Sequence, residues 1–286
     1  HVWDNQPYPI FNGIFYRSTD EVACISKVTY DILQNVSPEV SSYYVPHAVD
    51  SSAYYPYKVP EDVARAADVR NRLLNSTVNL KNPKKKIFFW NNRNARRKQS
   101  GTLIWWFKEW LDKVGHDKAT LLMHTDARDP HGQDLPHIIE HLGVNDGQVL
   151  LSTNKIEAPH LAAMYNAADF TINISDAEGF GLATLESLAC GTPIIVNMTG
   201  GLQEQVTDGE NWFGYGIQPV SKSVIGSLQV PYIYEDRISQ DDFNKVLSSA
   251  LKIRPKVYKE MSKLGIRHVA ANYSFETYQN TWVELM

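Results

Sequence analysis

Apolar and polar residues alternate along this chain with two different periods, most regularly from position 87 onward. Apolar runs with the length of buried strands lie at 87–90, 119–125, 148–153, 170–174 and 192–196. Stretches with helical spacing lie at 103–114, 135–142, 158–167 and 182–190. Strands that alternate with helices in this way predict an α/β fold with a parallel, doubly wound sheet. Ligands of such sheets bind at the carboxyl ends of the strands.

The flanking segments predict smaller elements. Before position 87 we expect an apolar stretch at 21–26, the start of a helix at 28–33, a strand at 40–45, a Ser-, Tyr- and Pro-rich linker at 51–60, and a helix at 61–75. After position 201 we expect a strand at 212–217, a long polar and aromatic loop at 219–235, and helices near 240–251, 255–271 and 275–285. The helix at 103–114 carries an aromatic stripe, which is typical of a core-facing side: Trp105, Trp106, Phe107 and Trp110.

The composition of the 286 residues is that of a soluble globular protein, with 43% hydrophobic and 21% charged residues. A net charge of −4 argues against bulk nucleic-acid binding. Cys24 and Cys190 are too few for a disulfide framework and indicate a reducing, cytoplasmic compartment. No apolar run reaches the length of a membrane span, and no signal-peptide pattern is present. Because the chain opens at His1 in a strand-like stretch, we expect further sequence upstream.

Candidate chemistry concentrates between positions 175 and 204. Glu178 and Glu186 stand eight apart, Gly179 and Gly181 follow the first glutamate, and a helix is expected to begin at Leu182. A helix start presents unpaired N–H groups and a partial positive charge, which makes it an anion site. Glycine at that place lets a ligand approach the backbone closely. The stretch therefore predicts an anion-binding loop with two carboxylates beside it.

Each glutamate taken alone also fits a plain structural role. Glu178 would then cap the helix, and Glu186 would be a solvated helix residue. The combination of both with the glycines and the Gly200-Gly201 turn favours a ligand site instead. In that interpretation the loop residue Glu178 faces the reacting part of the ligand, and Glu186, one turn into the helix, accepts hydrogen bonds from ligand hydroxyls.

Residues 178–204 resemble the donor-site signature of retaining glycosyltransferases with the GT-B fold, in particular glycosyltransferase family 4. That signature has E, seven residues and E, with G-F-G-L after the first E, then A-C-G-x-P and a G-G-x-x-E turn, and all of these stand here. The resemblance implies a GT-B type fold with a Rossmann-like donor domain and a remnant of the acceptor domain. By this resemblance residues 1–55 are the end of the N-terminal acceptor domain and its crossover. Residues 56–272 are the donor-binding C-terminal domain, and residues 273–286 are the closing helix that returns to the N-terminal lobe.

A basic cluster follows the predicted strand 87–90 and contains Arg93, Arg96, Arg97 and Lys98. A solvated loop or a nucleic-acid patch would have a similar composition. The negative net charge of the chain and the position of the cluster in the same sheet as the glutamates favour a diphosphate site. The resemblance assigns the diphosphate to Arg93 and Lys98, and it leaves Arg96 and Arg97 without a role.

The charge balance of such a site decides whether it needs a metal. A nucleoside diphosphate gains negative charge as it leaves the sugar, and some transferases neutralise that charge with a divalent cation. Here Arg93, Lys98 and the helix start at Leu182 and Ala183 supply positive charge, so we expect a metal-independent site without a cofactor. A polar loop with no recognisable metal-ligand spacing contains Asp126, Asp129, His131 and Asp134.

The resemblance also implies individual roles at the donor site. Glu178 and the amides of three residues are expected to meet the sugar: Gly179, Phe180 and Gly181. Glu186 is expected to take the ribose hydroxyls. The nucleoside is expected against the loop formed by Asn154, Lys155 and Ile156. Asp4 lies where relatives carry a polar residue near the reacting centre, although a turn aspartate fits that position equally well.

These features lead to one main hypothesis, a retaining hexosyltransferase. It would move a sugar from a UDP-, GDP- or ADP-sugar to a hydroxyl of a carbohydrate or lipid-linked acceptor in glycan synthesis. One alternative is a nucleotide-sugar epimerase or a glycan phosphorylase on the same fold, although no pyridoxal-lysine motif is evident. The other is a fragment that binds the donor without turnover. The sequence leaves the base, the sugar and the acceptor open.

Overall fold

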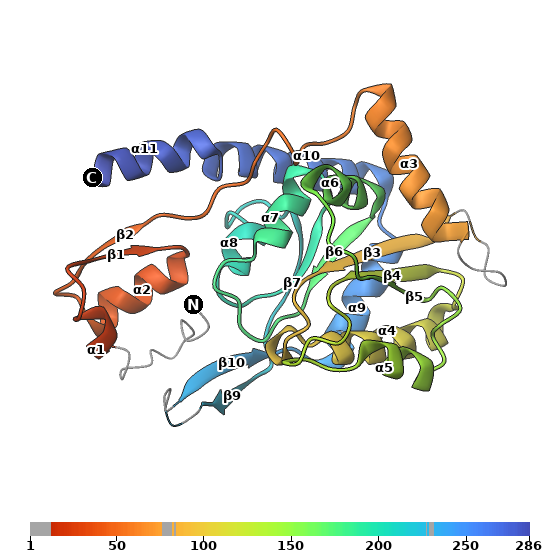
Figure 1. Cartoon of the computed structure of the whole chain (residues 1–286), viewed down its shortest axis with the longest axis horizontal. Coiled ribbons are helices and arrows are strands. Elements are labelled where there is room, and N and C mark those ends of the chain that lie inside the picture. Colours follow the sequence, from red (N-terminus) through yellow and green to blue (C-terminus); the bar gives the residue numbers. More distant parts are fainter. Residues whose placement is uncertain (1–12, 76–81, 83, 227, 229–231) are drawn as a thin grey trace.

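The computed structural model describes residues 13–75, 82, 84–226, 228 and 232–286, and Asp4 lies outside them. Its centre is one parallel sheet of six strands in the order β5-β4-β3-β6-β7-β8 (Figure 1). The strands are β3 (Lys86–Asn91), β4 (Ala119–His124), β5 (Val149–Ser152), β6 (Phe170–Asn173), β7 (Ile194–Asn197) and β8 (Gly214–Ile217). This is the doubly wound arrangement, which confirms the predicted fold class.

Helices cover both faces of the sheet (Figure 1). They are α3 (Pro60–Asn75), α4 (Ser100–Val114), α5 (Leu135–His141), α6 (Ala158–Ala167), α7 (Leu182–Ala189), α8 (Leu202–Val206), α9 (Gln240–Leu251) and α10 (Pro255–Asn272), with a short 3-10 turn, η2, at Arg96–Lys98. The predicted strands and long helices of this region are confirmed. The short helix α8 was not predicted.

Strand β3 illustrates why the sheet forms. Its residues from Ile87 to Trp90 are fully buried, as expected for a central parallel strand with helices on both sides. Side chains alternate between the faces. Phe88 packs in the core that α4 and α9 cover, with its ring 6.0 Å from that of Trp110. Phe89 packs in the core on the α3 and α6 side, with its ring 5.1 Å from that of Tyr165.

The first described residues form a smaller unit beside this domain. It contains α1 (Gly13–Tyr16), β1 (Glu21–Cys24), α2 (Lys27–Val36) and β2 (Ser41–Tyr44), with β1 and β2 paired in parallel. The last helix, α11 (Phe275–Leu285), runs back along this unit (Figure 1). The chain passes from this unit to the sheet through residues 46–50, called the crossover here. The crossover contacts the end of α10, because the Val49 amide donates to the Tyr273 carbonyl oxygen at 2.9 Å.

The predicted loop at 219–235 is wrong. This segment contains an antiparallel pair, β9 (Ser221–Ile225) and β10 (Ile233–Arg237). Its polar composition hid it, because charged residues face one another across the two strands. Lys222 lies opposite Asp236 and forms an ion pair with it.

The aromatic stripe of α4 is only partly a core face. Phe107 and Trp110 are buried as predicted, whereas Trp105 is 48% exposed and donates from its indole nitrogen to Glu109 at 2.9 Å. An exposed tryptophan can thus stand one position away from the buried face of a helix. Cys190 is buried, with 3% of its surface exposed.

Candidate active site

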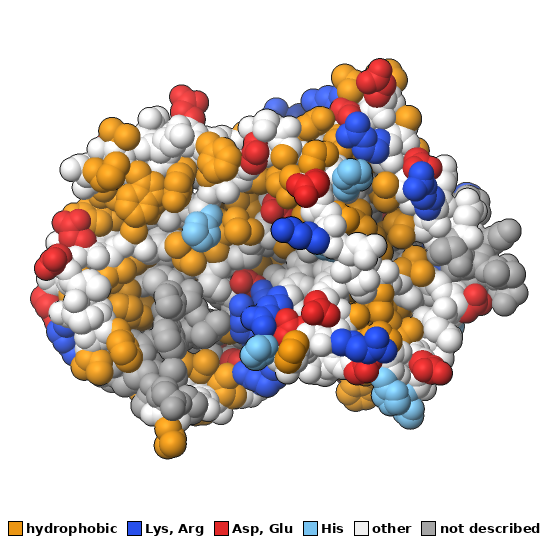
Figure 2. Space-filling model, in the orientation of Figure 1, with side chains coloured by type: hydrophobic (Ala, Val, Ile, Leu, Met, Phe, Trp, Pro, Cys, Tyr) orange, Lys and Arg blue, Asp and Glu red, His pale blue; other side chains and the backbone are white. Residues whose placement is uncertain are grey.

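The strand order reverses between β3 and β6, so this pair forms the switch point of the sheet. From β3 the chain moves outward to β4 and β5, and then it returns to β6 on the other side of β3. In sheets of this kind the ligand crevice lies between the loops at such a switch point, here the loops at the carboxyl ends of β3 and β6. They carry the basic cluster and the glutamate motif, respectively. In Figure 2 basic and acidic side chains gather in the middle of the visible face, in the region where Figure 1 draws these loops.

A buried ion pair joins the two loops. The Lys98 ammonium contacts the Glu178 carboxylate, and the two side chains are 8% and 9% exposed. The Asn173 amide, at the end of β6, lies 3.4 Å from the same carboxylate oxygen. Arg97 donates to the Ala177 carbonyl oxygen at 2.9 Å and lies 3.8 Å from Glu178 Oε2. Two cations therefore face one carboxylate at the switch point.

The protonation states follow from this arrangement. Burial alone raises the pKa of Glu178, but the charges of Lys98 and Arg97 and the Asn173 hydrogen bond outweigh it, so the pKa lies below its ordinary value. Burial lowers the pKa of Lys98, and Glu178 opposes that shift. Glu178 is thus a carboxylate at neutral pH, and its negative charge is held in place by its cationic neighbours.

Glycines bring the start of α7 close to Glu178. Gly181 begins the helix with φ +94°, and a Cβ atom on it would lie 3.5 Å from Glu178 Cγ and 2.7 Å from a Leu202 methyl group. Gly200, with φ +50°, passes so close beneath the loop that its Cβ would lie 1.6 Å from the Glu178 carbonyl oxygen. The Gly201 amide donates to that same oxygen at 3.2 Å. The Gly200-Gly201 turn thus supports the glutamate loop from below.

The Phe180 side chain turns away from the crevice and is 3% exposed. Its ring meets His47 of the crossover edge-on at 5.2 Å and Tyr273 at 5.8 Å. Phe180 therefore ties the motif loop to the junction between the two parts of the chain, and only its backbone remains for the expected contact with a sugar.

Glu186 lies on α7 in a chain of hydroxyl and amide groups. Its carboxylate accepts a hydrogen bond from Tyr165 at 2.8 Å, and the Asn91 amide donates to the Tyr165 hydroxyl, also at 2.8 Å. Burial raises the pKa of Glu186, and the hydrogen bonds from Tyr165 and Tyr54 counteract part of that shift. Asn91 ends β3, so this chain connects Glu186 to the switch point.

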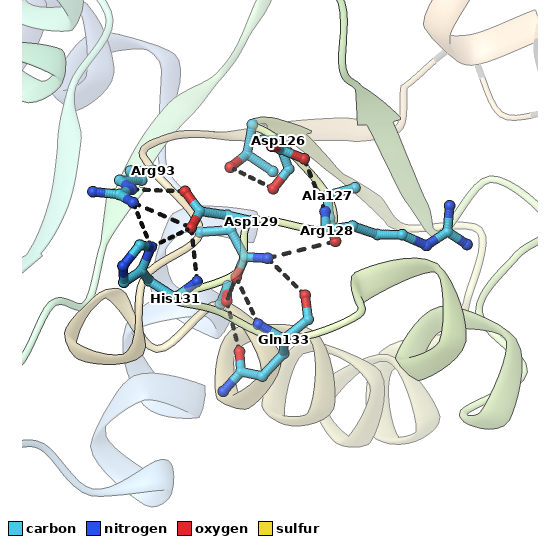
Figure 3. Close-up of polar contacts among 10 residues, drawn as sticks. Arg93, Asp126, Ala127, Arg128, Asp129, His131 and Gln133 are labelled. Carbon is cyan, nitrogen blue, oxygen red and sulfur yellow. Dashed lines mark hydrogen bonds and ion pairs between the residues drawn. The ribbon is translucent and has the colours of Figure 1, made fainter.

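Arg93 stands apart from this group in the structure. Its guanidinium donates to both carboxylate oxygens of Asp129, at 2.6 and 3.2 Å, and lies 2.8 Å from His131 Nδ1 (Figure 3). Its side chain is 60% exposed. The ion pair belongs to the loop after β4, which is the neighbouring strand of the sheet.

The carboxylates of that loop have partners within the described protein. Asp126 accepts from the Arg128 amide at 3.0 Å (Figure 3), and Asp134 caps α5 by accepting from the His137 amide at 3.1 Å. Arg93 holds the pKa of Asp129 well below its ordinary value. The polar residues that crowd this loop therefore have structural roles as caps, turns and an ion pair.

The remaining expected donor residues lie at the same edge of the sheet. Asn154, Lys155 and Ile156 follow β5, and the first two are exposed. Two interstrand spacings, about 10 Å, separate β5 from β3. Leu182 is 47% exposed at the start of α7, with Ala183 next to it and Gly179 in the loop before it.

Sequence reasoning missed several residues at this edge. Arg97 had no assigned role, yet it is the arginine beside Glu178. Arg96 binds Glu235 of β10 with two hydrogen bonds, at 2.7 and 3.0 Å. Tyr165 was not singled out, because only folding brings a helical tyrosine under Glu186. The three successive basic residues of η2 have different partners because the turn directs each side chain differently. Their residue types alone therefore did not indicate which partner each would have.

The fold is GT-B-like, with a Rossmann-like parallel sheet of six strands in its larger domain. Residues 72–265 match the family model described as Glycosyl transferases group 1, and the chain belongs to this family. Among solved structures, sucrose-phosphate synthase from Thermosynechococcus elongatus superimposes with a TM-score of 0.73 at 22% identity, over 96% of this chain and 59% of that one. This likeness concerns the fold.

Two curated relatives show how far the sequence similarity extends. An alpha-monoglucosyldiacylglycerol synthase from Streptococcus pneumoniae is 24% identical over 79% of this chain and 48% of its own length. A D-inositol 3-phosphate glycosyltransferase from Paenarthrobacter aurescens is 40% identical over 27% of this chain and 18% of its own. The chain thus spans at most about half the length of these relatives. No helix among its described residues is both long and apolar enough to cross a membrane.

The close approach at Gly200 predicts a position-specific cost. A Gly200→Ala variant combines a positive φ with a clash against the Glu178 carbonyl, and we expect a loss of roughly 2–4 kcal/mol in the free energy of unfolding. Gly209→Ala is the matched control, because Gly209 has φ +99° but open space around it, so only about 1–2 kcal/mol should be lost. Urea unfolding measures both. Equal losses would contradict the support given to the glutamate loop.

Proposed function

We propose that this chain is the donor-binding part of a retaining glycosyltransferase that takes a sugar from a nucleoside-diphosphate donor. The observation that carries the proposal is the buried Lys98–Glu178 pair at the switch point, with Arg97 beside it and the start of α7 next to it. Family membership supports the same reaction class.

The diphosphate would bind where positive charge converges. Lys98 and Arg97 both face the crevice loop, and the first amides of α7 at Leu182 and Ala183 have no partner within their helix. Each charge-assisted hydrogen bond contributes about 1.5–3 kcal/mol. Those that strengthen as charge develops on the leaving phosphate accelerate the reaction.

In this proposal Arg93 contacts the diphosphate only after Arg97 and Lys98 have bound it. In the structure it is paired with Asp129, so it has to exchange that partner before it reaches a phosphate. The Arg93 side chain is largely exposed, so water can replace Asp129 as its partner during the exchange. We expect Arg97 and Lys98 to hold the diphosphate first and Arg93 to join them.

The same exchange gives Glu178 its role. When Lys98 turns to a phosphate, the carboxylate loses its closest partner and becomes available for sugar hydroxyls. Hydroxyl donors on the sugar would then restore its hydrogen bonds. The sugar would lie against the Gly179–Gly181 backbone, and the acceptor hydroxyl would approach the same face of the sugar as the leaving phosphate.

The nucleoside half of the donor would extend toward Glu186 and the loop after β5. Glu186 is oriented by Tyr165 and can accept hydrogen bonds from the two ribose hydroxyls. Asn154, Lys155 and Ile156 would contact the base. The two relatives leave the acceptor open, since one is an inositol phosphate glycosyltransferase and the other is a synthase of a glucosyl lipid.

A nucleotide-sugar epimerase on the same scaffold would use the same donor contacts. Product analysis separates the two reactions, because a transferase joins the labelled sugar to an acceptor, whereas an epimerase returns a free or nucleotide-bound isomer. Retention is read from the anomeric proton coupling of the product. A chain that binds the donor without turnover would still show the binding described next.

The test is calorimetric titration of the 286-residue chain with UDP, GDP and ADP and with their sugars. We expect one diphosphate to bind in the micromolar range without added metal, and its nucleoside monophosphate to bind at least about tenfold more weakly. Absence of binding by all three diphosphates would falsify the proposal.

Substitutions at the ion pair are predicted to separate nucleotide binding from chemistry. Lys98→Met should weaken diphosphate binding by about 10–100-fold, because one charge-assisted contact is lost. Glu178→Gln should leave diphosphate affinity unchanged or improve it, since Lys98 is freed, and it should abolish transfer. Calorimetry and a labelled-donor assay measure the two effects.

The control for folding is the double variant Lys98→Met/Glu178→Gln. Removing one partner of a buried pair leaves an uncompensated charge, whereas removing both restores neutrality. The double variant should therefore unfold at a higher temperature than Lys98→Met alone. If Glu178→Gln weakened diphosphate binding as strongly as Lys98→Met does, the exchange model would be wrong.

Glu186 is predicted to select the ribose. Glu186→Gln should lower affinity for the preferred diphosphate by about tenfold and remove its preference over the 2′-deoxy analogue. Tyr57→Phe serves as a control, because its hydroxyl donates to the Pro159 carbonyl oxygen on α6, outside the proposed site. A variant that still distinguishes the two sugars as the wild type does would place the ribose elsewhere.

A further inference from the structure

Asp176, two residues before Glu178, is held by two other segments of the chain. Its amide donates to the Arg97 carbonyl oxygen at 2.8 Å, and its carbonyl oxygen accepts from the Asp236 amide of β10, also at 2.8 Å. Its carboxylate accepts hydrogen bonds from the Gln99 amide and the Arg237 guanidinium. The residue is 3% exposed. The loop after β3, the loop after β6 and the β9–β10 pair therefore meet at one buried side chain.

Gln99 shows that this junction holds the backbone in an uncommon conformation. It is the non-glycine residue with positive φ (+56°) among those that the structure describes. It directly follows Lys98, so its conformation sets the direction in which the chain leaves the η2 turn that carries Lys98. A left-handed glutamine persists only where its surroundings hold it. Its side chain is fixed by Asp176 at one end and by the Thr102 hydroxyl, at 2.6 Å, at the other.

We propose that Asp176 is a positioning residue whose carboxylate, through Gln99 and Arg237, holds the η2 turn at the switch point, where Lys98 can reach the diphosphate, and makes donor binding depend on its negative charge. The proposal rests on the proposed function, since it concerns how the same site is assembled. It adds a residue that contacts neither diphosphate nor sugar. It also gives the β9–β10 pair a task, because Arg237 belongs to β10.

The charges around Asp176 come from two elements. Arg237 and Glu235 face it from β10, and Arg96 faces it from η2, where Arg96 is itself paired with Glu235. Burial and the charge of Glu235 raise the pKa of Asp176, and Gln99, Arg237 and Arg96 lower it. Burial is the largest of these effects, and the resulting pKa is about 6. The carboxylate is therefore mostly ionised at pH 7.5 and mostly protonated at pH 5.

The pH dependence of the free energy of unfolding distinguishes a positioning residue from one that only stabilises the fold. The pKa of Asp176 in the folded protein lies above the ordinary value of 3.8, so the folded state takes up a proton as the pH falls from about 6 toward 3.8. Stability from this group therefore increases on acidification, and the ionised carboxylate lowers stability at neutral pH. A residue that serves only to stabilise the fold would show the opposite.

Space is available for the loop to relax when the charge is lost. A cavity of about 240 Å³ lies beside Asp176, between Gln99, Trp106 and Arg237. When Asp176 is protonated, Gln99 can swing into this cavity, and η2 then loses the contact that directs Lys98.

The test uses Asp176→Asn in the 286-residue chain, with calorimetric titration of the diphosphate that the wild type binds between pH 5 and pH 8. We expect about tenfold weaker binding by the variant at pH 7.5 and equal binding at pH 5, so that the affinity ratio changes near pH 6. Because the ratio is taken at each pH, the titration of the ligand phosphates cancels. The melting temperature of the variant at pH 7.5 should equal or exceed that of the wild type.

Asp241→Asn, an exposed change of the same charge on α9, should leave the ratio at one throughout. Gln99→Leu should weaken binding at pH 7.5 as Asp176→Asn does, and it carries the test if the aspartate variant fails to fold. A ratio for Asp176→Asn that is flat with pH, or a loss of affinity matched by a lower melting temperature, overturns the inference while the proposed function stands. Failure of the wild type to bind any diphosphate overturns both.

Discussion

The ion pair between Lys98 and Glu178 is the interaction on which the architecture of the site depends. Two buried charges are costly unless each has the other, so the loops that carry them have to meet at one defined place. The glycines serve this requirement, since Gly200 passes against the glutamate loop and Gly181 turns the chain into α7. The reversal of strand order between β3 and β6 provides the crevice in which the pair lies. Glu178 compensates the positive charge of Lys98 until a phosphate takes its place.

Much of this arrangement was accessible from the sequence, for physical reasons. The central strands are buried on both faces and therefore read as continuous apolar runs, and the doubly wound fold followed from their alternation with helices. The encounter of the loops after β3 and β6 followed from the same rule. The charged β9–β10 pair could not be predicted, because its stability comes from partners such as Lys222 and Asp236, fourteen positions apart, in a sequence without hydrophobic alternation. The sequence also could not predict which of Arg93, Arg96 and Arg97 lies beside Glu178, because this depends on the single turn of η2.

A third carboxylate of the motif acts at the junction of the two parts of the chain. Glu204 accepts from the first amide of α2, at Lys27, at 2.9 Å and from the Tyr44 hydroxyl at 3.1 Å. A carboxylate at a helix N-terminus is favourable. With Phe180 packed on His47, one end of the glutamate motif is thus attached to the crossover, and the other end is attached to the unit that precedes it. A displacement of the motif on donor binding would be transmitted to that unit.

The self-contained pairing of β9 and β10 has a practical consequence for protein engineering. The two strands pair with each other and are fastened to the domain at the base, through Asp236 and Arg237, while Val224 near the tip is 67% exposed. Such an arm tolerates replacement of its outer residues as long as its base is kept. A fluorescent label on a cysteine placed at position 224 would therefore project into solvent from this arm.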